Sequence, residues 1–157
     1  MMPRNIGLFS LFALLALVLS GCCTVQEPDT RALLRANIMA SEDSNPDSNG
    51  RPSPVMVRIY QLKSGCNFED ADFSSLHTDD EAVLGADLLF KEEMDVYPGT
   101  EIPFGRELQG HARYLGVTAA FRDLRDATWR ALADLPDQGE SSLIIEIGDS
   151  SVSIRRP

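Results

Sequence analysis

The chain has little of what metal centres and nucleic-acid surfaces require. Its 157 residues include two histidines and three cysteines, and 24 acidic residues outnumber 14 basic ones, for a formal net charge of −10. Transition-metal sites use mainly histidine and cysteine, so little material is present for one. Nucleic-acid binding is disfavoured because a surface that neutralises phosphates must be basic. Hydrophobic residues make up 43% of the chain, which excludes disorder by composition and indicates one folded domain plus appendages.

The longest apolar run lies near the amino terminus. Residues Ile6–Leu19 are almost entirely apolar and follow a single charge, Arg4. A charged start, an apolar run of about 7–15 residues and small residues after it are typical of a secretory signal. A transmembrane helix needs about 20 apolar residues. We therefore expect a signal peptide over 1–21, a polar tether over 22–30 and one domain over 31–157.

The end of this run, Leu19-Ser20-Gly21-Cys22, is similar to the lipobox of bacterial lipoproteins. In such proteins the signal is cleaved before the cysteine, which then carries acyl chains. The resemblance implies that Cys22 is the lipidation site; a secreted protein without lipid is the alternative. An aspartate after the acylated cysteine commonly retains a lipoprotein at the inner membrane. Cys23 stands there instead, so we expect delivery to the outer membrane.

The rest of the sequence predicts a mainly β domain. Alternation of apolar and polar residues predicts strands at Arg31–Ala40, Val55–Leu62, Asp87–Val96, Glu101–Leu108, Arg113–Phe121, Leu143–Ile147 and Val152–Ile154. Pro103 makes the fourth strand an edge strand. Gly148-Asp149 predicts a hairpin turn between the last two. Short strands with regular turns favour a β-sandwich.

Three segments break the strand pattern. Ser41–Pro54 has no apolar residue except its three prolines, so we expect a loop. Asn67–Gly85 has apolar residues at helical spacing, and Thr78 stands three residues before Glu81 as in a capping box, so short helices are expected. The charged run Arg122–Asp126 reads as a solvated connection ahead of Trp129, a packing anchor.

The sequence offers weak candidates for chemistry. His77 and His111 are the two histidines, and no G-x-S-x-G, H-E-x-x-H or C-x-x-C motif accompanies them, so we expect no catalytic site. Asn45, Asp47, Asn49 and Gly50 match the first positions of an EF-hand loop, but Met56 stands where a bidentate glutamate is required. A solvated turn explains these residues, and we expect no metal or cofactor.

Cys66 follows Ser64-Gly65 in an expected turn. In an oxidising compartment this thiol can pair with Cys23 or remain free or in a mixed disulfide. The position of Cys23 on the tether beside the lipid neither forbids nor demands this pair, and the second outcome is favoured.

An ordered set of motifs resembles the outer-membrane lipoprotein family of the type VI secretion system (TssJ-type). The set comprises Asn45-Pro46-Asp47 with Asn49-Gly50, Ser53–Lys63, Phe68, Ala71–Phe73, Leu76, Leu84–Asp87, Pro98-Gly99, Tyr114–Asp123 and Trp129-Arg130. The resemblance implies a transthyretin-like β-sandwich with a small helical insertion, which agrees with the strand pattern. It also implies a non-enzymatic lipoprotein that holds the periplasmic C-terminal region of a large inner-membrane subunit at the outer membrane.

The family contacts its partner through the loop between the first two strands, which corresponds here to Ser41–Pro54. In an antiparallel sandwich the loops after strands one, three and five emerge at one end, so the turn at Pro98-Gly99 and Arg122–Ala127 should lie nearby. The expected partner-binding residues are Asn45, Pro46, Asp47, Ser48, Asn49, Gly50, Pro98 and Gly99. The alternatives are a periplasmic ligand-binding lipoprotein and a transthyretin-like hydrolase, both disfavoured by the scarcity of exposed aromatic residues and histidines.

Replacement of Cys22 tests the anchor. Cys22→Ser is expected to block acylation and signal cleavage by the lipoprotein route, because serine lacks the thiol that receives the acyl chain. Metabolic acyl labelling and membrane fractionation measure this. Cys23→Asp is the matched variant: it should keep the label and shift the protein toward the inner membrane. Acyl label on the Cys22→Ser protein in the outer membrane would contradict the assignment.

Overall fold

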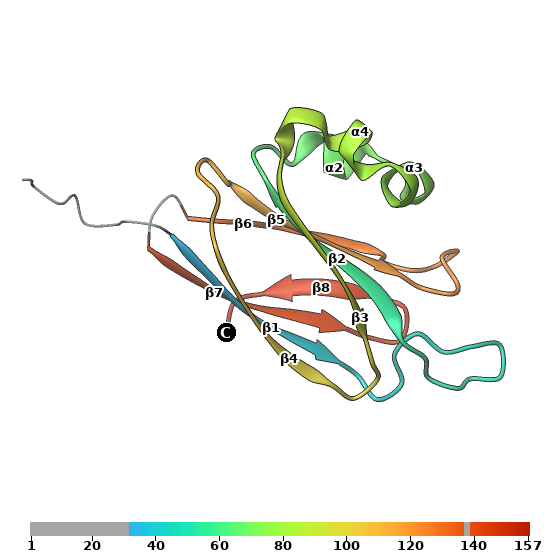
Figure 1. Ribbon diagram of the computed structural model, residues 1–157. Helices are drawn as coiled ribbons and strands as arrows, with labels where there is room; N and C mark the ends of the chain where they lie inside the picture. Colours follow the sequence, from blue (N-terminus) through green and yellow to red (C-terminus); the bar gives the residue numbers. More distant parts are fainter. Residues whose placement is uncertain (1–31, 137–138) are drawn as a thin grey trace, which may run out of the picture.

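Alternating apolar and polar residues build two four-stranded sheets that pack face to face (Figure 1). The computed structural model describes residues 32–136 and 139–157. In spatial order, the first sheet holds β4 (Glu101–Glu107), β1 (Leu33–Ala40), β7 (Glu140–Ile147) and β8 (Val152–Arg155). The second holds β3 (Leu88–Val96), β2 (Val55–Leu62), β5 (Tyr114–Ala120) and β6 (Arg130–Asp134). The predicted class, a mainly β sandwich with a small helical insertion, is confirmed. The predicted signal peptide and tether lie outside the described residues.

One apolar core fills the space between the sheets, because alternate side chains of each strand point inward. On β1, Leu34 and Ile38 are fully buried, whereas Arg35 and Met39 are exposed. The other strands add inward residues in the same way, among them Val57, Ile59, Leu115, Val117, Ala119, Leu143, Ile145 and Ile147. Burial of an aliphatic side chain of this size stabilises a protein by about 1.5–3 kcal/mol, so this cluster is the main source of stability.

The strand β1 lies inside the first sheet between partners from distant parts of the chain. It pairs antiparallel with β4, where Leu34 faces Arg106, and parallel with β7, where Leu34 faces Ser141. Pro103 lies on β4, which is an edge strand as predicted, so its missing N–H breaks no ladder of the interior. The parallel pair requires a long crossover, so the sandwich closes only when the C-terminal part of the chain has joined β1.

The sequence did not predict the strand β6. It pairs antiparallel with β5, with Thr118 facing Arg130. Its sequence, RALAD, has alanines on either side of one large apolar residue, Leu132. The alternation of large apolar and polar residues is therefore weak. The charged run Arg122–Asp126 before it is a largely exposed connection, as expected, and Trp129 packs against the core.

Three short helices and a 3-10 turn cover the outer face of the second sheet (Figure 1). They are α2 (Cys66–Asp70), α3 (Phe73–Thr78), α4 (Asp80–Leu84) and η1 (Gly85–Asp87). Helices were predicted here, but the predicted N-cap is wrong: Thr78 ends α3, and Asp79 caps α4 by accepting a hydrogen bond from the Ala82 amide at 3.1 Å. Aspartate caps helices at least as well as threonine, so the start shifts by one residue. In the described part of the chain, no helix is long and apolar enough to span a membrane.

A second apolar cluster lies between these helices and the second sheet. It consists of Tyr60, Leu62, Phe68, Leu76 and Leu84. Gly116 makes room for it: a Cβ at this position would lie 3.0 Å from ring carbons of Phe68 and 3.2 Å from Leu62. The absence of a side chain at Gly116 on β5 therefore lets the helical insertion pack closely against the second sheet.

One residue of β3 faces differently from the prediction. Strict alternation along the predicted strand Asp87–Val96 would place Leu88, Phe90, Met94 and Val96 on one face. Phe90, Met94 and Val96 pack in the core between the sheets, but Leu88 packs in the helical cluster. The pairing of β2 with β3 shifts register between Gln61 and Leu62, so the first residue of β3 turns to the other side of the sheet.

Gly116→Val is expected to destabilise the domain by about 1–3 kcal/mol, because the new side chain would overlap a closely packed ring. Gly105→Val on the exposed face of β4 is the matched control, since nothing lies within 4 Å of a Cβ there. Thermal or urea unfolding of both variants measures the difference. Equal stability of the two variants would show that the insertion does not pack as described.

Candidate functional site

The loops that follow β1, β3, β5 and β7 meet at one end of the sandwich. The Gly99 amide donates to the Ser41 carbonyl at 3.0 Å, and the Asn45 amide donates to the Asp149 carbonyl at 2.9 Å. The Arg122 amide donates to Asn45 Oδ1 at 2.8 Å. The clustering expected from the sequence is confirmed, and the loop after β7 joins it. We call this the loop end, and the opposite end, where β1 begins, the tether end (Figure 1).

Asn45 holds the base of the long loop. Its side chain donates to the Pro54 carbonyl at 2.6 Å and accepts from the Arg122 amide, while its own carbonyl accepts from the Ser53 hydroxyl. Its φ is 49°, a left-handed conformation that asparagine tolerates better than most residues. Asn45 is 3% exposed and positions the loop through these bonds, and its role in binding the partner stays a prediction.

The tip of the loop, Asp47–Pro52, is folded back on itself. Asp47 accepts hydrogen bonds from the Asn49 amide at 2.8 Å, the Arg51 amide at 3.0 Å and Arg51 Nε at 2.8 Å. Gly50, at φ 75°, donates to the Asp47 carbonyl at 2.8 Å. Residues Ser48–Pro52 are exposed around this turn. The sequence analysis named Ser48, Asn49 and Gly50 as partner-binding residues, and Arg51 and Pro52 are exposed on the same tip.

The hydrogen bonds from Arg51 and Asn49 lower the pKa of Asp47 below its ordinary value of 3.8. A carboxylate with a depressed folded pKa stabilises the fold above the ordinary value and loses this contribution as the pH falls through the lower one. The tip therefore keeps its shape throughout the neutral and mildly acidic range.

The turn at Tyr97–Thr100 lies against the base of the loop. Gly99 has a φ of 68°, and the Glu42 side chain lies 3.4 Å from the position a Cβ would take. Tyr97 is 58% exposed, one of two exposed large hydrophobic residues in the described part of the chain. The sequence analysis named Pro98 and Gly99 as partner-binding residues, and the exposed ring of Tyr97 directly precedes them.

The weaker candidates are not brought together. The oxygens of Asn45 and Asp47 accept hydrogen bonds from protein groups, and no cluster of three potential metal ligands occurs within 32–136 and 139–157. His77 stacks on Phe73 in α3, whereas His111 lies in the turn between β4 and β5. Cys66 is exposed at the start of α2 and forms no disulfide with a described residue. Its predicted choice between pairing with Cys23 and remaining free depends on a residue outside the described part, as does lipidation at Cys22.

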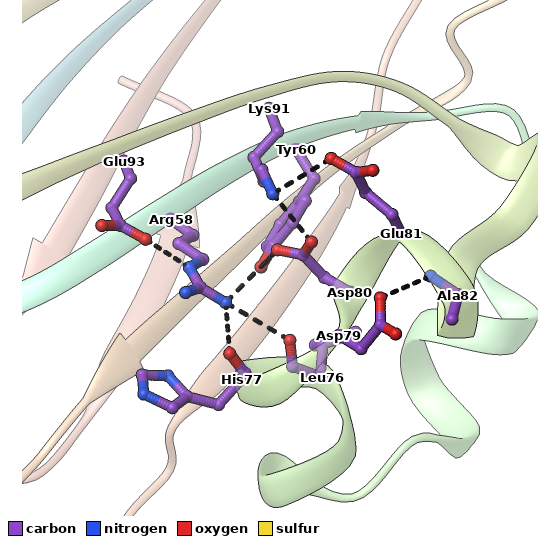
Figure 2. Close-up of polar contacts among 10 residues, drawn as sticks. All are labelled: Arg58, Tyr60, Leu76, His77, Asp79, Asp80, Glu81, Ala82, Lys91 and Glu93. Carbon is purple, nitrogen blue, oxygen red and sulfur yellow. Dashed lines mark hydrogen bonds and ion pairs between the residues drawn. The ribbon is translucent and has the colours of Figure 1, made fainter.

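A buried carboxylate, Asp80, joins the helical insertion to the second sheet (Figure 2). It is 4% exposed, and no other charged side chain in the described part is buried. Its Oδ1 accepts from Lys91 Nζ at 2.8 Å, and its Oδ2 accepts from the Tyr60 hydroxyl at 3.1 Å and from Arg58 Nη1 at 3.3 Å. Both oxygens are thus satisfied by groups from β2 and β3.

Arg58 extends this cluster to the preceding helix (Figure 2). Its Nε donates to Glu93 at 2.6 Å, and its Nη1 donates to the carbonyls of His77 at 2.9 Å and Leu76 at 3.3 Å. A cation at the last carbonyls of a helix is favourable, because these groups carry partial negative charge. Arg58 therefore ties the end of α3 and the start of α4 to the same point on the sheet.

The protonation states in this cluster suit its structural role. The hydrogen bond to Asp80 raises the pKa of Lys91, and burial raises the pKa of Tyr60 to about 12. The tyrosine consequently remains a hydrogen-bond donor at neutral pH. The cluster positions the insertion through groups that already have partners.

The fold and the loop end define a class of protein. It is a two-sheet β-sandwich with one long, internally hydrogen-bonded loop at the end opposite the start of β1. The sequence model of the family described as "Type VI secretion lipoprotein, VasD, EvfM, TssJ, VC_A0113" matches residues 32–150. The chain belongs to this family, as the sequence motifs indicated.

Solved structures agree with this assignment. The T6SS lipoprotein TssJ1 from Pseudomonas aeruginosa is 34% identical, with a TM-score of 0.78 over 81% of this chain and 97% of that chain. Serratia marcescens Lip, a membrane-bound component of the type VI secretion system, is 29% identical, with a TM-score of 0.74 over 81% and 98%. A chain in a structure described as the T6SS protein TssM C-terminal domain from EAEC is 27% identical, with a TM-score of 0.69 over 80% and 98%. A search of the curated proteins gives no match.

Asn45→Ala is expected to destabilise the domain by about 1–3 kcal/mol, because it removes two partly buried side-chain hydrogen bonds and places alanine at a positive φ. Asn49→Ala at the exposed tip is the matched control and should change stability by less than about 0.5 kcal/mol. Denaturant unfolding measures both. If the two variants unfold at the same midpoint, Asn45 does not hold the loop.

Proposed function

We propose that this protein is the outer-membrane lipoprotein of a type VI secretion membrane complex and that it anchors the periplasmic C-terminal region of the large inner-membrane subunit. The observation that carries the proposal is the loop end, where an exposed, preshaped tip is mounted on a base made of three other connections. The role is structural rather than enzymatic.

The comparisons support an assembly role. Chains similar to this one over nearly their whole length occur in a structure described as the TssM C-terminal domain and in one described as the type VI membrane complex. Family membership supports attachment to a membrane by lipid. Cys22 supplies that lipid attachment, and Cys23 in the following position favours the outer membrane.

The physical form of the loop suits binding. Folding alone does not require its length, because Ser41–Pro54 adds no large apolar side chain to the core. The bonds within Asp47–Pro52 fix the tip before any partner arrives, which reduces the conformational entropy lost on binding. Tyr97 adds an exposed aromatic ring near the base, and such residues are enriched among the side chains that dominate binding energy.

The structure sharpens the choice of variant for a binding test. Exchange of the whole Asn45–Gly50 segment would remove the base as well as the tip. A Gly-Ser linker of equal length in place of Ser48–Pro52 keeps Asn45. This variant is expected to retain the wild-type Tm within a few degrees and to lose at least about tenfold in affinity for the periplasmic region of the inner-membrane subunit, since about 1.4 kcal/mol corresponds to tenfold.

Titration calorimetry with the mature protein measures this affinity. The matched control replaces Gln109–His111, exposed residues at the tether end, by Gly-Ser-Gly. This control should bind as the wild type does. Wild-type affinity of the Ser48–Pro52 variant would place the interface elsewhere, at the tether end or on the helical insertion.

A further inference from the structure

The free edges of β6 and β8 face each other on one side of the sandwich. Near the loop end they are joined: Val152 donates to the Thr128 carbonyl at 2.8 Å, and Thr128 donates to the Ser150 carbonyl at 3.0 Å. Toward the tether end the strands separate. A hollow of about 370 Å³ opens there, lined by Ala133, Asp134, Leu143, Ile154, Arg155 and Arg156.

The short length of β8 explains this hollow. The strand pairs with β7 only at Ile144–Ile147. In the described part, the first half of β7 therefore has a paired strand on its β1 side alone. The buried side chain of Leu143 consequently forms part of the hollow's apolar lining, together with Ala133 and Ile154.

The rim of the hollow carries most of the charge. Arg155 and Arg156 are exposed, and Arg155 Nε lies 2.8 Å from Glu146 in a pair whose side chains are 50% and 43% exposed. Asp134 is the acidic residue that lines the hollow. Because the Arg155–Glu146 pair is solvated, its strength is small and either group can change partner. Arg155 and Arg156 thus line the same hollow as three apolar residues, and arginine pairs with phosphate while the apolar lining can contact the adjoining glycerol and acyl carbons of a phospholipid.

The hollow lies at the end of the domain that the lipid tether enters. The Leu33 amide donates to the Gly139 carbonyl at 3.0 Å, so β1 begins beside the start of β7 (Figure 1). Only residues 23–31 separate Cys22 from Ala32, a length that spans at most about 35 Å.

We propose that the hollow between β6 and β8 holds the headgroup of an anionic phospholipid, with Arg155 and Arg156 on the phosphate, and that this contact turns the loop end away from the membrane. The inference rests on the lipid attachment in the proposed function. A tether of this length keeps the hollow at high effective concentration near the bilayer, so a weak contact is sufficient. An arginine near an anionic bilayer favours such a contact by roughly fivefold.

Energy transfer from Cys66 to labelled lipid tests the orientation. Gly65 packs against Leu132 of β6, so a dye on the exposed Cys66 thiol reports from the hollow's end of the domain. The mature lipoprotein with Cys23→Ser is placed in phosphatidylethanolamine vesicles that contain either phosphatidylglycerol or phosphatidylcholine and an acceptor-labelled lipid. Transfer is expected to be higher with phosphatidylglycerol, and Arg155→Glu with Arg156→Glu should abolish the difference.

Arg51→Glu with Arg125→Glu is the matched control, because it changes the charge equally at the loop end, where these side chains are 75% and 86% exposed. It should keep the phosphatidylglycerol effect. Equal loss in both double variants would indicate net charge alone, and no effect in the wild type would mean no headgroup contact; either overturns the proposal. Displacement by inorganic phosphate would overturn the assignment to a lipid.

A second double variant and a flotation measurement separate loss of folding and loss of the lipid anchor from loss of the headgroup contact. If the glutamate variant does not fold, Arg155→Gln with Arg156→Gln takes its place and should show the same loss. Vesicle flotation of the wild-type protein measures the lipid anchor itself. Failure to float contradicts the anchor, whereas a protein that floats without a phosphatidylglycerol effect contradicts only the headgroup contact.

Discussion

The burial of the second sheet on both faces is the constraint on which the rest of the structure depends. On β2, Val57 and Ile59 face the core between the sheets, and Tyr60 and Leu62 on the other side need a cover of their own. The helical insertion supplies that cover, and Asp80 fixes its position through charged and hydroxyl partners on the sheet. Loss of one partner of a buried charge costs about 3–5 kcal/mol, so any other position of the insertion that left Asp80 unpaired would be disfavoured. The apolar cluster therefore provides stability, and the charge selects one position of the insertion.

The loop end shows a comparable division between base and tip. The Asn45 side chain bonds to the backbone of Pro54 and of Arg122, and the Ser53 hydroxyl accepts a hydrogen bond from the Arg122 side chain. These bonds tie the loop to both sheets. The tip uses the carboxylate of Asp47 to close its own turn. Because the base is bonded inward and the tip to itself, the outward surface of the tip is free to vary in sequence while its position stays fixed by the scaffold.

The strands connect two ends of different chemical character. Eight-residue strands such as β1 place the ends roughly 26 Å apart at about 3.3 Å per residue. The loop end presents the exposed polar tip and Tyr97, and the tether end presents the hollow with its two arginines. Under the proposed function, the tether end faces the lipid and the loop end faces the protein partner.

Local patterns in the sequence determined the strands with large alternating side chains, the polar loop, the short helices and the family motifs, because each depends on residues near one another in the chain. Other features depended on pairings between distant segments. The strand β6 forms by pairing with the edge of β5, and Asn45 is buried because it bonds to Arg122 and Pro54. Leu88 lies on the other face of the sheet because the pairing of β2 with β3 shifts register. Asp80 reads in the sequence as one more surface acid of a helix start, and only the tertiary structure brings Arg58, Tyr60 and Lys91 around it. The physical reason is that burial, and with it the role of a polar group, is set by what packs against it, and those contacts come from residues far away in the chain.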